Sequence, residues 1–293
     1  MKILLTGKNG QTGWELQRTL STLGEVAAPD RYDLDLVDPG AIAAAIGSMK
    51  PDIIVNAAAY TAVDRAEAEP EKARMINAIA PTLMAQEARK AGSAIIHYST
   101  DYVFDGETLE IPYTEEAATA PLNVYGHTKL EGDMGVMASG APYLILRTAW
   151  VYSAMARPNF LASVMNRARQ GGEIRMVADQ TGSPTWARVV AEATAQIISK
   201  LSGPKGVSFE GFEGVYNVAC KGNVTRFQQA RAIIKRMKLD APVDVIPIKT
   251  AEYPLPARRP AHSALSVEKV EKTFGLCMPQ WEQSLGLCME EAR

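Results

Sequence analysis

Three glycines near the start of the chain constrain the fold more than any other feature. Gly7, Gly10 and Gly13 directly follow the apolar run 2–6 and open a stretch with helical spacing. A glycine-rich turn between strand and helix permits a tight bend, close approach of the backbone to a pyrophosphate, and close packing of helix on strand. The spacing differs from the Gly-x-Gly-x-x-Gly of many dehydrogenases. Its position nevertheless favours a dinucleotide site over an ordinary glycine-rich turn.

Short apolar runs alternate with longer amphipathic stretches along the first half of the chain, which predicts a doubly wound parallel sheet of the Rossmann type, an α/β fold. The runs that predict strands are 2–6, 25–28, 52–56, 94–99, 143–148 and 174–177, and the stretches that predict helices are 11–23, 39–49, 70–90 and 122–138. We expect residues 1–150 to form a dinucleotide-binding domain and residues 151–293 mainly a smaller substrate-binding domain. Some later segments, including 215–219, are candidates to return to the sheet.

The composition excludes several classes of protein. With 31 basic and 33 acidic residues the net charge is -2, so the chain lacks the basic excess that nucleic-acid binding needs. Three widely spaced cysteines, Cys220, Cys277 and Cys288, fit neither a disulfide framework nor a zinc site. The apolar run 3–5 is too short for a signal peptide or a membrane span. We therefore expect a cytoplasmic protein without nucleic-acid or membrane partners.

Tyr125 and Lys129 form a candidate catalytic pair on the predicted helix 122–138. Residues four apart lie on one helix face, so a phenol and an ammonium can act on one site. A nearby cation lowers the pKa of a tyrosine toward the range useful for proton transfer. Such a pair also occurs as an ordinary surface contact, so its meaning depends on the nucleotide motif that precedes it.

Charged residues after the second predicted strand bear on the cofactor. Asp30 stands where a carboxylate would accept hydrogen bonds from an adenosine ribose, which favours NADH. Arg31 beside it favours the 2'-phosphate of NADPH. Asp35 and Leu36 are candidates to frame the adenine. A solvated turn of charges explains the same residues, so the choice between NADH and NADPH stays open.

The ends of the third and fourth predicted strands supply further candidates, because catalytic groups collect at the carboxyl edge of such sheets. Ala59 leaves room for a cofactor, and Tyr60 and Thr61 extend toward the cleft. The Thr100 hydroxyl is placed to donate to a substrate carbonyl beside Tyr125. A strand-end cap is the alternative role for Thr100.

Six segments together resemble the extended short-chain dehydrogenase/reductase superfamily over nearly the whole chain. They are GKNGQTGWEL at 7–16, VNAAAYTAVD at 55–64, STDYVFDG at 99–106, PLNVYGHTK at 121–129, RTAWVY at 147–152 and DQTGSPT at 179–185. The resemblance implies reduction of the C4 keto group of a dTDP-linked 4-keto-6-deoxysugar by NADPH or NADH. The alternatives within the superfamily are a dinucleotide-binding regulatory subunit of the methionine adenosyltransferase type and a reductase or epimerase of a related nucleotide sugar.

The resemblance also implies roles for individual residues. Tyr125 matches the proton donor, Lys129 a contact to the nicotinamide ribose, and Thr100 a residue that tunes proton transfer. The positions implied to line the dinucleotide site are Gly10, Gln11, Thr12, Asp30, Asp35, Leu36, Ala59, Tyr60 and Thr61, to which we add Gly7 and Gly13 of the turn. Those implied to meet the nucleotide-sugar substrate are Asp101 and Trp150, with Arg259 or His262 near its diphosphate, and Thr100 and Tyr102 are further candidates. Core packing is the alternative role for Trp150, and a solvated loop for the segment 258–265.

Magnesium is implied for some members of this group, at a contact between subunits that would make a homodimer. Glu15 is the retained candidate ligand, whereas Arg188 stands where another carboxylate is expected. One carboxylate seldom holds Mg²⁺ against water, so we expect activity to survive chelation. The alternative is that Glu192, or the pair Glu290 and Glu291, supplies the missing ligands from a neighbouring subunit.

Overall fold

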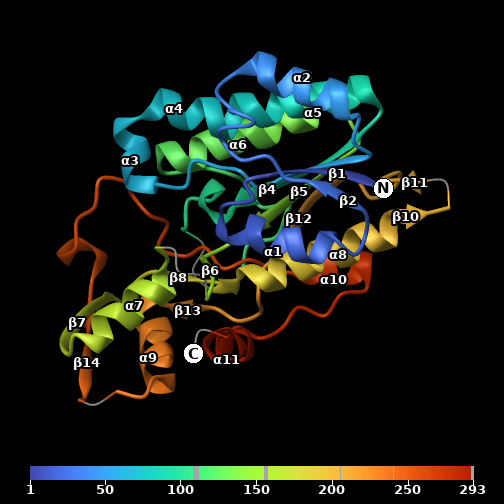
Figure 1. Ribbon diagram of the computed structural model, residues 1–293. Helices are drawn as coiled ribbons and strands as arrows, with labels where there is room; N and C mark the ends of the chain where they lie inside the picture. Colours follow the sequence, from blue (N-terminus) through green and yellow to red (C-terminus); the bar gives the residue numbers. More distant parts are fainter. Residues whose placement is uncertain (108–111, 155–157, 205, 240, 292–293) are drawn as a thin grey trace.

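A six-stranded parallel sheet forms the centre of the molecule (Figure 1). The computed structural model describes residues 1–107, 112–154, 158–204, 206–239 and 241–291. The strand order is β12-β5-β4-β3-β1-β2, so the chain starts inside the sheet and winds outward in both directions. The strands are β1 (Lys2–Thr6), β2 (Glu25–Ala27), β3 (Ile53–Asn56), β4 (Ala94–Thr100), β5 (Tyr143–Thr148) and β12 (Gly214–Asn217). This is the predicted doubly wound α/β fold.

Helices cover both faces of this sheet, as Figure 1 shows. One face packs against α2 (Pro39–Met49), α5 (Ala80–Ala91) and α6 (Val124–Ala138). The other face packs against α1 (Gln11–Leu20), α8 (Ala187–Leu201) and α10 (Glu268–Phe274). Apolar side chains alternate between the two cores along the strands: Leu4 and Ile54 point to the first, and Ile3 and Leu5 to the second. Strands buried on both faces are what a parallel sheet requires.

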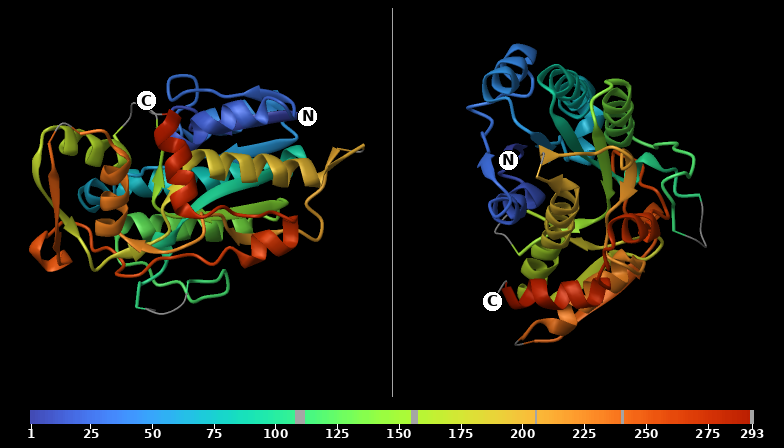
Figure 2. Two further views of the ribbon diagram at one scale, coloured as in Figure 1. Left: turned by 90° about the horizontal axis from the view of Figure 1, so that it is seen from below. Right: turned by 90° about the vertical axis from the view of Figure 1, so that its right-hand side faces the viewer.

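A smaller lobe lies at one end of the molecule (Figure 2, left). It contains α7 (Phe160–Arg169), α9 (Arg226–Arg236) and a two-stranded parallel sheet of β7 (Gly172–Val177) and β14 (Val243–Ile248). The prediction that residues 174–177 continue the main sheet is wrong, because β7 pairs with β14 instead. The returning strand is β12, which pairs with β5 from Gly214↔Leu144 to Asn217↔Arg147. The strand candidate at 215–219 thus overlaps the sixth strand.

The predicted helix 70–90 is divided in the structure. It runs as α4 (Pro70–Arg74), a π-helical segment (Met75–Ile79) and α5. A π segment widens the helix by one residue per turn and often marks a functional place. Here it buries Asn77, whose amide accepts from the Tyr60 N–H and donates to the Tyr60 carbonyl and the Thr128 hydroxyl. The segment therefore holds the chain after β3 against helix α6.

The remaining elements are short or belong to the C-terminal half. They are α3 (Val63–Ala68), a 3-10 turn (Asp101–Val103), β6 (Val151–Tyr152), β8 (Thr181–Gly182), β9 (Thr185–Trp186), β10 (Ser202–Gly203), β11 (Gly206–Val207), β13 (Val224–Thr225), a 3-10 turn (Thr250–Glu252) and α11 (Trp281–Glu291). In the described part of the chain, no helix combines the length and apolar character needed to cross a membrane.

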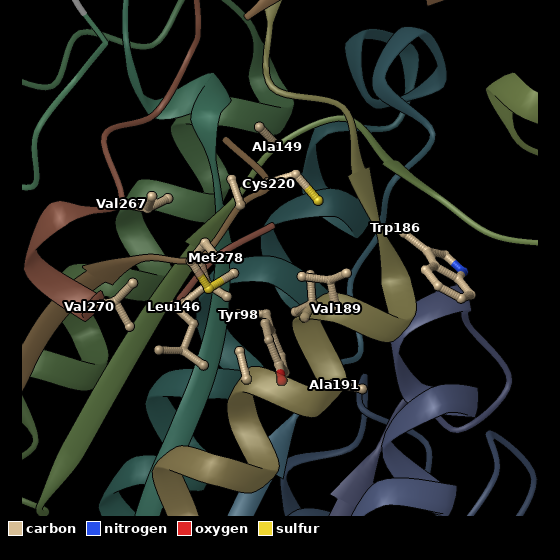
Figure 3. Packing of buried hydrophobic residues seen from close by; sticks show 14 of the residues in the cluster. Tyr98, Leu146, Ala149, Trp186, Val189, Ala191, Cys220, Val267, Val270 and Met278 are labelled. Atoms are coloured by element: carbon tan, nitrogen blue, oxygen red, sulfur yellow. The ribbon is translucent and has the colours of Figure 1, made fainter. Parts of the chain in front are cut away.

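The larger core joins the two halves of the chain (Figure 3). Tyr98 of β4 and Leu146 of β5 pack against Val189 of α8 and Met278, which precedes α11. The Tyr98 hydroxyl lies 2.5 Å from the hydroxyl of Thr194 in α8, so the buried phenol is satisfied within this core. Since α8 comes from the C-terminal half, this contact fixes it against the sheet that carries the predicted site.

Candidate active site

A cavity of about 780 Å³ lies at the carboxyl edge of the main sheet, as expected for this fold. From the glycine turn and the start of α1 it is lined by Gly7, Gly10, Gln11 and Thr12, and from the segment after β3 by Ala57, Ala58, Ala59 and Thr61. From β4 and its turn come Ser99, Thr100, Asp101 and Tyr102, and from α6 come Tyr125 and Lys129. Trp150 and Arg226 also lie in the wall. The structure thus brings the predicted glycine turn, the Tyr–Lys pair and Thr100 to one place.

The glycine turn is compact. Gly7 has a φ of 78°, a conformation that favours glycine, and the Gly10 N–H donates to the Gly7 carbonyl at 2.9 Å. A Cβ added to Gly13 would lie 2.0 Å from that carbonyl oxygen, so helix α1 can approach the turn only with a glycine there. Gly13 is a packing residue behind the cavity wall, while the N-terminus of α1 faces the cavity, where it favours an anion.

Helix α6 presents Tyr125 to the cavity. Asn123 caps this helix by accepting from the Gly126 N–H at 2.8 Å, and its amide donates to the Arg258 carbonyl at 2.7 Å. Burial is the main influence on the Tyr125 phenol and raises its pKa, while a hydrogen bond with Thr100 opposes the rise. The expectation that a neighbouring cation dominates and lowers this pKa is wrong in this structure. The phenol is accordingly a weak acid that holds its proton.

Lys129 is turned toward the sheet. Its Nζ donates to the Tyr98 carbonyl at 2.6 Å and lies 3.1 Å from Nε2 of His97. Burial lowers the pKa of Lys129 to about 8, with the carboxylate of Asp133 opposing the shift. The pKa of His97 is also lowered, by burial and then by Lys129. No sequence signal pointed to His97, because a histidine inside an apolar strand looks like any other core residue.

Thr100 connects the phenol to the end of β4. Its side chain accepts from the Tyr102 N–H at 3.2 Å and its hydroxyl donates to Asp101 at 3.1 Å. Asp101 also accepts from Ser263 at 2.5 Å, and burial raises its pKa to about 6. Tyr102 meets Tyr125 edge to face at 5.7 Å. Thr100 therefore both caps the strand end and faces the cavity.

Several predicted cofactor contacts lie outside this cavity lining. Asp30 accepts from the Tyr32 N–H at 2.8 Å and lies 3.9 Å from the Lys8 ammonium, and the Tyr32 hydrogen bond lowers its pKa. Arg31 lies over the exposed Tyr32 ring. Asp35 accepts from the Val37 N–H, Leu36 packs at the edge of the core beneath α2, and the Tyr60 hydroxyl donates to Glu69 at 2.9 Å. Their roles stay predictions.

A second cavity, of about 910 Å³, lies beside the first. Its wall includes Asp179, Tyr253, Arg258 and Arg259. Arg226 lines both cavities and was missed by the sequence reasoning, since its only local signal is a capping box that starts α9. Its guanidinium carbon lies 3.4 Å from the centre of the Trp150 ring and 4.8 Å from that of Phe160. A partly buried cation thus stands between the two cavities.

Trp150 and Arg259 are both held by partners. Trp150 has a φ of 47°, its ring is covered on one side by Arg226, and a Cβ on Gly182 would lie 2.3 Å from it. The Trp150 ring therefore serves as packing support as well as cavity wall. Arg259 pairs with Asp64 at 2.7 Å, and His262 is buried beside Tyr113. His262 is not part of either cavity wall, whereas Arg259 lines the second.

Glu15 does not fit a magnesium site in this structure. Its carboxylate is buried and lies 2.7 Å from Arg18 and 3.2 Å from Arg188, which also contacts Glu291. Two guanidinium groups supply the positive charge that a cation would otherwise bring, and both donate to Oε2 of the carboxylate. Across the described ranges, no group of three or more acidic, histidine or cysteine side chains is arranged to hold a metal ion.

Comparison with known proteins identifies the family. The model of the family described as "RmlD substrate binding domain" matches residues 1–293. The chain belongs to this family. It is 41% identical over 297 residues to a dTDP-4-dehydrorhamnose reductase of Burkholderia thailandensis, with 99% of both chains covered. It is 40% identical over 299 residues to the enzyme of the same name from Escherichia coli K12, covering 99% of this chain and 98% of the relative.

Solved structures of the RmlD family have the same architecture. A dTDP-4-dehydrorhamnose reductase from Clostridium acetobutylicum superposes with a TM-score of 0.91 at 37% identity, covering 99% of each chain. The Bacillus anthracis protein of that name, solved in complex with NADP, gives a TM-score of 0.90 at 32% identity, again covering 99% of each. A Thermus thermophilus UDP-glucose 4-epimerase, at 20% identity and a TM-score of 0.83, shares the fold.

Proposed function

We propose how this chain carries out the NAD(P)H-dependent reduction of dTDP-4-dehydro-β-L-rhamnose to dTDP-L-rhamnose. The activity itself is that of relatives about 40% identical over 99% of the chain. One observation carries the assignment of residues: Tyr125, Lys129 and Thr100 line the same cavity as the glycine turn. The superfamily resemblance alone left a non-catalytic binding protein and an epimerase open. The match to reductases along the whole chain favours reduction over both.

In this proposal the dinucleotide lies across the glycine turn. Gln11 and Thr12 open helix α1 and line the cavity, so their backbone N–H groups are placed to bind the pyrophosphate. Ala57 to Ala59 leave room at the edge of β3. When bound, the nicotinamide supplies a hydride to the C4 carbon of the sugar. NADP occupies the Bacillus anthracis relative, and we propose that NADH also serves here, because Asp30 and Arg31 stand side by side.

Tyr125 donates the proton in the proposed reaction. Reduction of a ketone develops negative charge on the carbonyl oxygen, and a positioned acid neutralises it. The Tyr125 phenol keeps its proton at neutral pH because burial raises its pKa, so it reaches the reaction protonated. The hydrogen bond with Thr100 lowers that pKa. Once the phenol has given up its proton, the Thr100 hydroxyl turns from Asp101 to donate to the phenolate and stabilises it. Thr100 therefore tunes the acid that it contacts.

The second cavity is the proposed place for the nucleotide part of the substrate. Arg226 stands at the junction of the cavities and Arg259 lines the second one. Guanidinium groups bind phosphate oxygens through paired N–H donors, so both residues are suited to a diphosphate. In this arrangement the sugar reaches toward Tyr125 while the base lies between α7 and the segment after β14. The proposed division of labour is a dinucleotide lobe of residues 1–150 and a mainly substrate-binding lobe of residues 151–293.

The test is a direct assay of the purified protein. NADPH and NADH oxidation is followed on addition of dTDP-4-dehydrorhamnose and of related dTDP- and UDP-linked 4-keto sugars. Tyr125→Phe is expected to lower turnover by about 10²-fold or more while cofactor affinity stays within a few-fold, since general acid catalysis typically supplies about 10²–10⁴-fold. The matched control is Tyr143→Phe, because Tyr143 begins β5 and therefore lies at the end of the strand away from the cavity. Normal turnover in Tyr125→Phe would remove Tyr125 from the reaction.

A further inference from the structure

A buried polar cluster lies behind Lys129, on the side away from the cavity. Its members come from three strands and one helix: Asn56 of β3, His97 of β4, Arg147 of β5, and Lys129 and Asp133 of α6. Each is at most 4% exposed as a whole residue. Polar side chains this deep carry a large desolvation cost and need defined partners. The arrangement of their hydrogen-bond donors therefore limits which protonation states they can take.

Asn56 determines where the His97 proton lies. The Asn56 Oδ1 accepts from the Thr6 hydroxyl at 2.6 Å and from the Ala58 N–H at 3.2 Å. The backbone N–H of Ala58 can only donate, so the amide cannot be flipped and its Nδ2 faces His97. Nδ2 can only donate, and it lies 3.0 Å from His97 Nδ1. Nδ1 is therefore the acceptor, and the neutral His97 ring carries its proton on Nε2.

The proton on His97 Nε2 points toward Lys129. His97 Nε2 lies 3.1 Å from Lys129 Nζ, whereas the nearest carboxylate oxygen, Asp133 Oδ1, is 3.7 Å away. An ammonium group has no lone pair and would set a donor against a donor at hydrogen-bonding distance. An uncharged amine accepts the Nε2 proton and still donates to the Tyr98 carbonyl. The geometry is thus satisfied by the amine form of Lys129 and not by the ammonium.

The charges within the cluster also favour the amine form of Lys129. Asp133 is the carboxylate among these five residues, and Arg147 Nε lies 3.9 Å from its Oδ2, which also accepts from Ser99 at 2.6 Å. Arginine stays protonated in proteins, so Arg147 already matches the charge of Asp133. Within the cluster, a protonated Lys129 would leave two positive charges against one negative charge; Glu115 and Glu116, which lie outside it, act on Arg147. The lowered pKa of Lys129 favours the uncharged amine as well.

We propose that Asn56 and His97 act in series as positioning residues that hold Lys129 as an uncharged amine, retracted from Tyr125, until it is protonated. Protonation removes the lone pair with which Nζ accepts from His97 Nε2–H. The ammonium therefore leaves His97 for the cavity, toward the phenol and the proposed ribose position. The catalytic meaning of this step rests on the proposed function, whereas the placement of the protons does not. The titratable groups that act on Lys129 are His97 from β4 and Asp133 from α6, while Arg147 from β5 lies against Asp133.

The position of the His97 proton is measurable without turnover. Protein labelled with ¹⁵N in its histidines is studied by NMR at about pH 9, above the lowered lysine pKa, and the His97 signals are assigned by their loss in His97→Gln. The expected spectrum has a protonated Nε2 and an unprotonated Nδ1. A proton on Nδ1, or on both nitrogens, would overturn the proposal. The wild-type protein suffices for this arm, so it does not depend on how any variant folds.

Asn56→Asp tests the coupling between the residues. A carboxylate at this position accepts from Nδ1–H and reverses the tautomer, which leaves Nε2 free to accept from the Lys129 ammonium. The alkaline limb of the kcat profile, where Lys129 loses its proton, is then expected to move up by about one pH unit or more. His127→Gln, which changes an exposed histidine on the same helix, is expected to leave the limb in place.

The NMR spectrum and the pH profile together distinguish a failure of the proposed proton arrangement from a failure of the proposed function. An added negative charge alone would raise the lysine pKa, but it would not remove the proton from Nε2. If Nε2 stays protonated in Asn56→Asp, the serial coupling is wrong even if the limb moves. If the tautomers behave as expected and no keto sugar is reduced, the proposed function fails while the arrangement of protons stands.

Discussion

Replacing Gly13 by alanine tests whether the glycine turn is built for close packing. The new Cβ would lie 2.0 Å from the Gly7 carbonyl oxygen and 2.6 Å from its carbon, both backbone atoms that cannot rotate away. A contact of this kind needs a separation above 3 Å, so the turn and helix α1 must move apart by about 1 Å. The Gly7 carbonyl also accepts from the Gly10 N–H, and that hydrogen bond is strained by the same movement.

The magnitude follows from two opposing effects. Alanine in place of glycine inside a helix stabilises by about 1 kcal/mol. Overpacking costs about 1–3 kcal/mol, and a weakened hydrogen bond about 0.5–1.5 kcal/mol. The net expectation for Gly13→Ala is a loss of about 1–3 kcal/mol in the free energy of unfolding. Because the displaced turn also carries the proposed pyrophosphate site, the Kd for NADPH is expected to rise by about tenfold or more.

Gly47→Ala is the matched control. Gly47 is exposed in helix α2, and a Cβ there would meet nothing within 4 Å. This variant gains the helix preference without the clash, so it is expected to stabilise by up to about 1 kcal/mol. Urea unfolding and NADPH titration of both variants provide the comparison. The packing argument is refuted if Gly13→Ala is as stable as Gly47→Ala and binds NADPH as the parent does.

Three further predictions concern the cofactor, the substrate and the metal. Asp30→Ala is expected to shift the ratio of kcat/KM values toward NADPH by removing repulsion of the 2'-phosphate, and an unchanged ratio would place Asp30 away from the ribose. Arg226→Met is expected to raise the KM for the nucleotide sugar about tenfold or more, because a charge-assisted hydrogen bond contributes about 1.5–3 kcal/mol. The control Arg231→Met, which changes an exposed arginine on the same helix, is expected to leave this KM unchanged. Activity and sedimentation are expected to be the same in excess EDTA and in millimolar Mg²⁺. If EDTA both abolishes activity and dissociates a dimer, the protein has a metal site, and its ligands are residues other than Glu15.

The parallel sheet was predictable because its strands are buried on both faces. Runs such as Ile3 to Leu5 and Ile53 to Val55 are apolar throughout, and each is followed by turn residues and a helical pattern. Residues 174–177 were misassigned because a short run with apolar residues on either side of an exposed Arg175 also suits a small sheet at the edge of a lobe. Which strand pairs with which is decided by tertiary packing, and periodicity along the chain carries no information about it.

The site was predictable where function depends on backbone shape or fixed spacing, and less so where it depends on contacts distant in sequence. The glycine turn and the pair Tyr125 and Lys129 could be found from spacing alone. Arg226 could not, since it reaches the cavities from the start of α9, far along the chain from the glycine turn. The orientation of Lys129 was hidden for the same reason: its partner His97 is 32 residues away and belongs to another element.

The return of the chain to the main sheet has a consequence for how the protein can be divided. Strand β12 supplies the edge beside β5, and α8 covers α1, with the Thr19 hydroxyl donating to the Ala191 carbonyl. A fragment of residues 1–150 would therefore expose an unpaired backbone edge on β5 and the apolar side of α1, both of which invite aggregation. The lobes are interlocked rather than joined in tandem. Neither half can be exchanged as an independent module, and a new substrate preference has to arise by substitution within the interlocked chain.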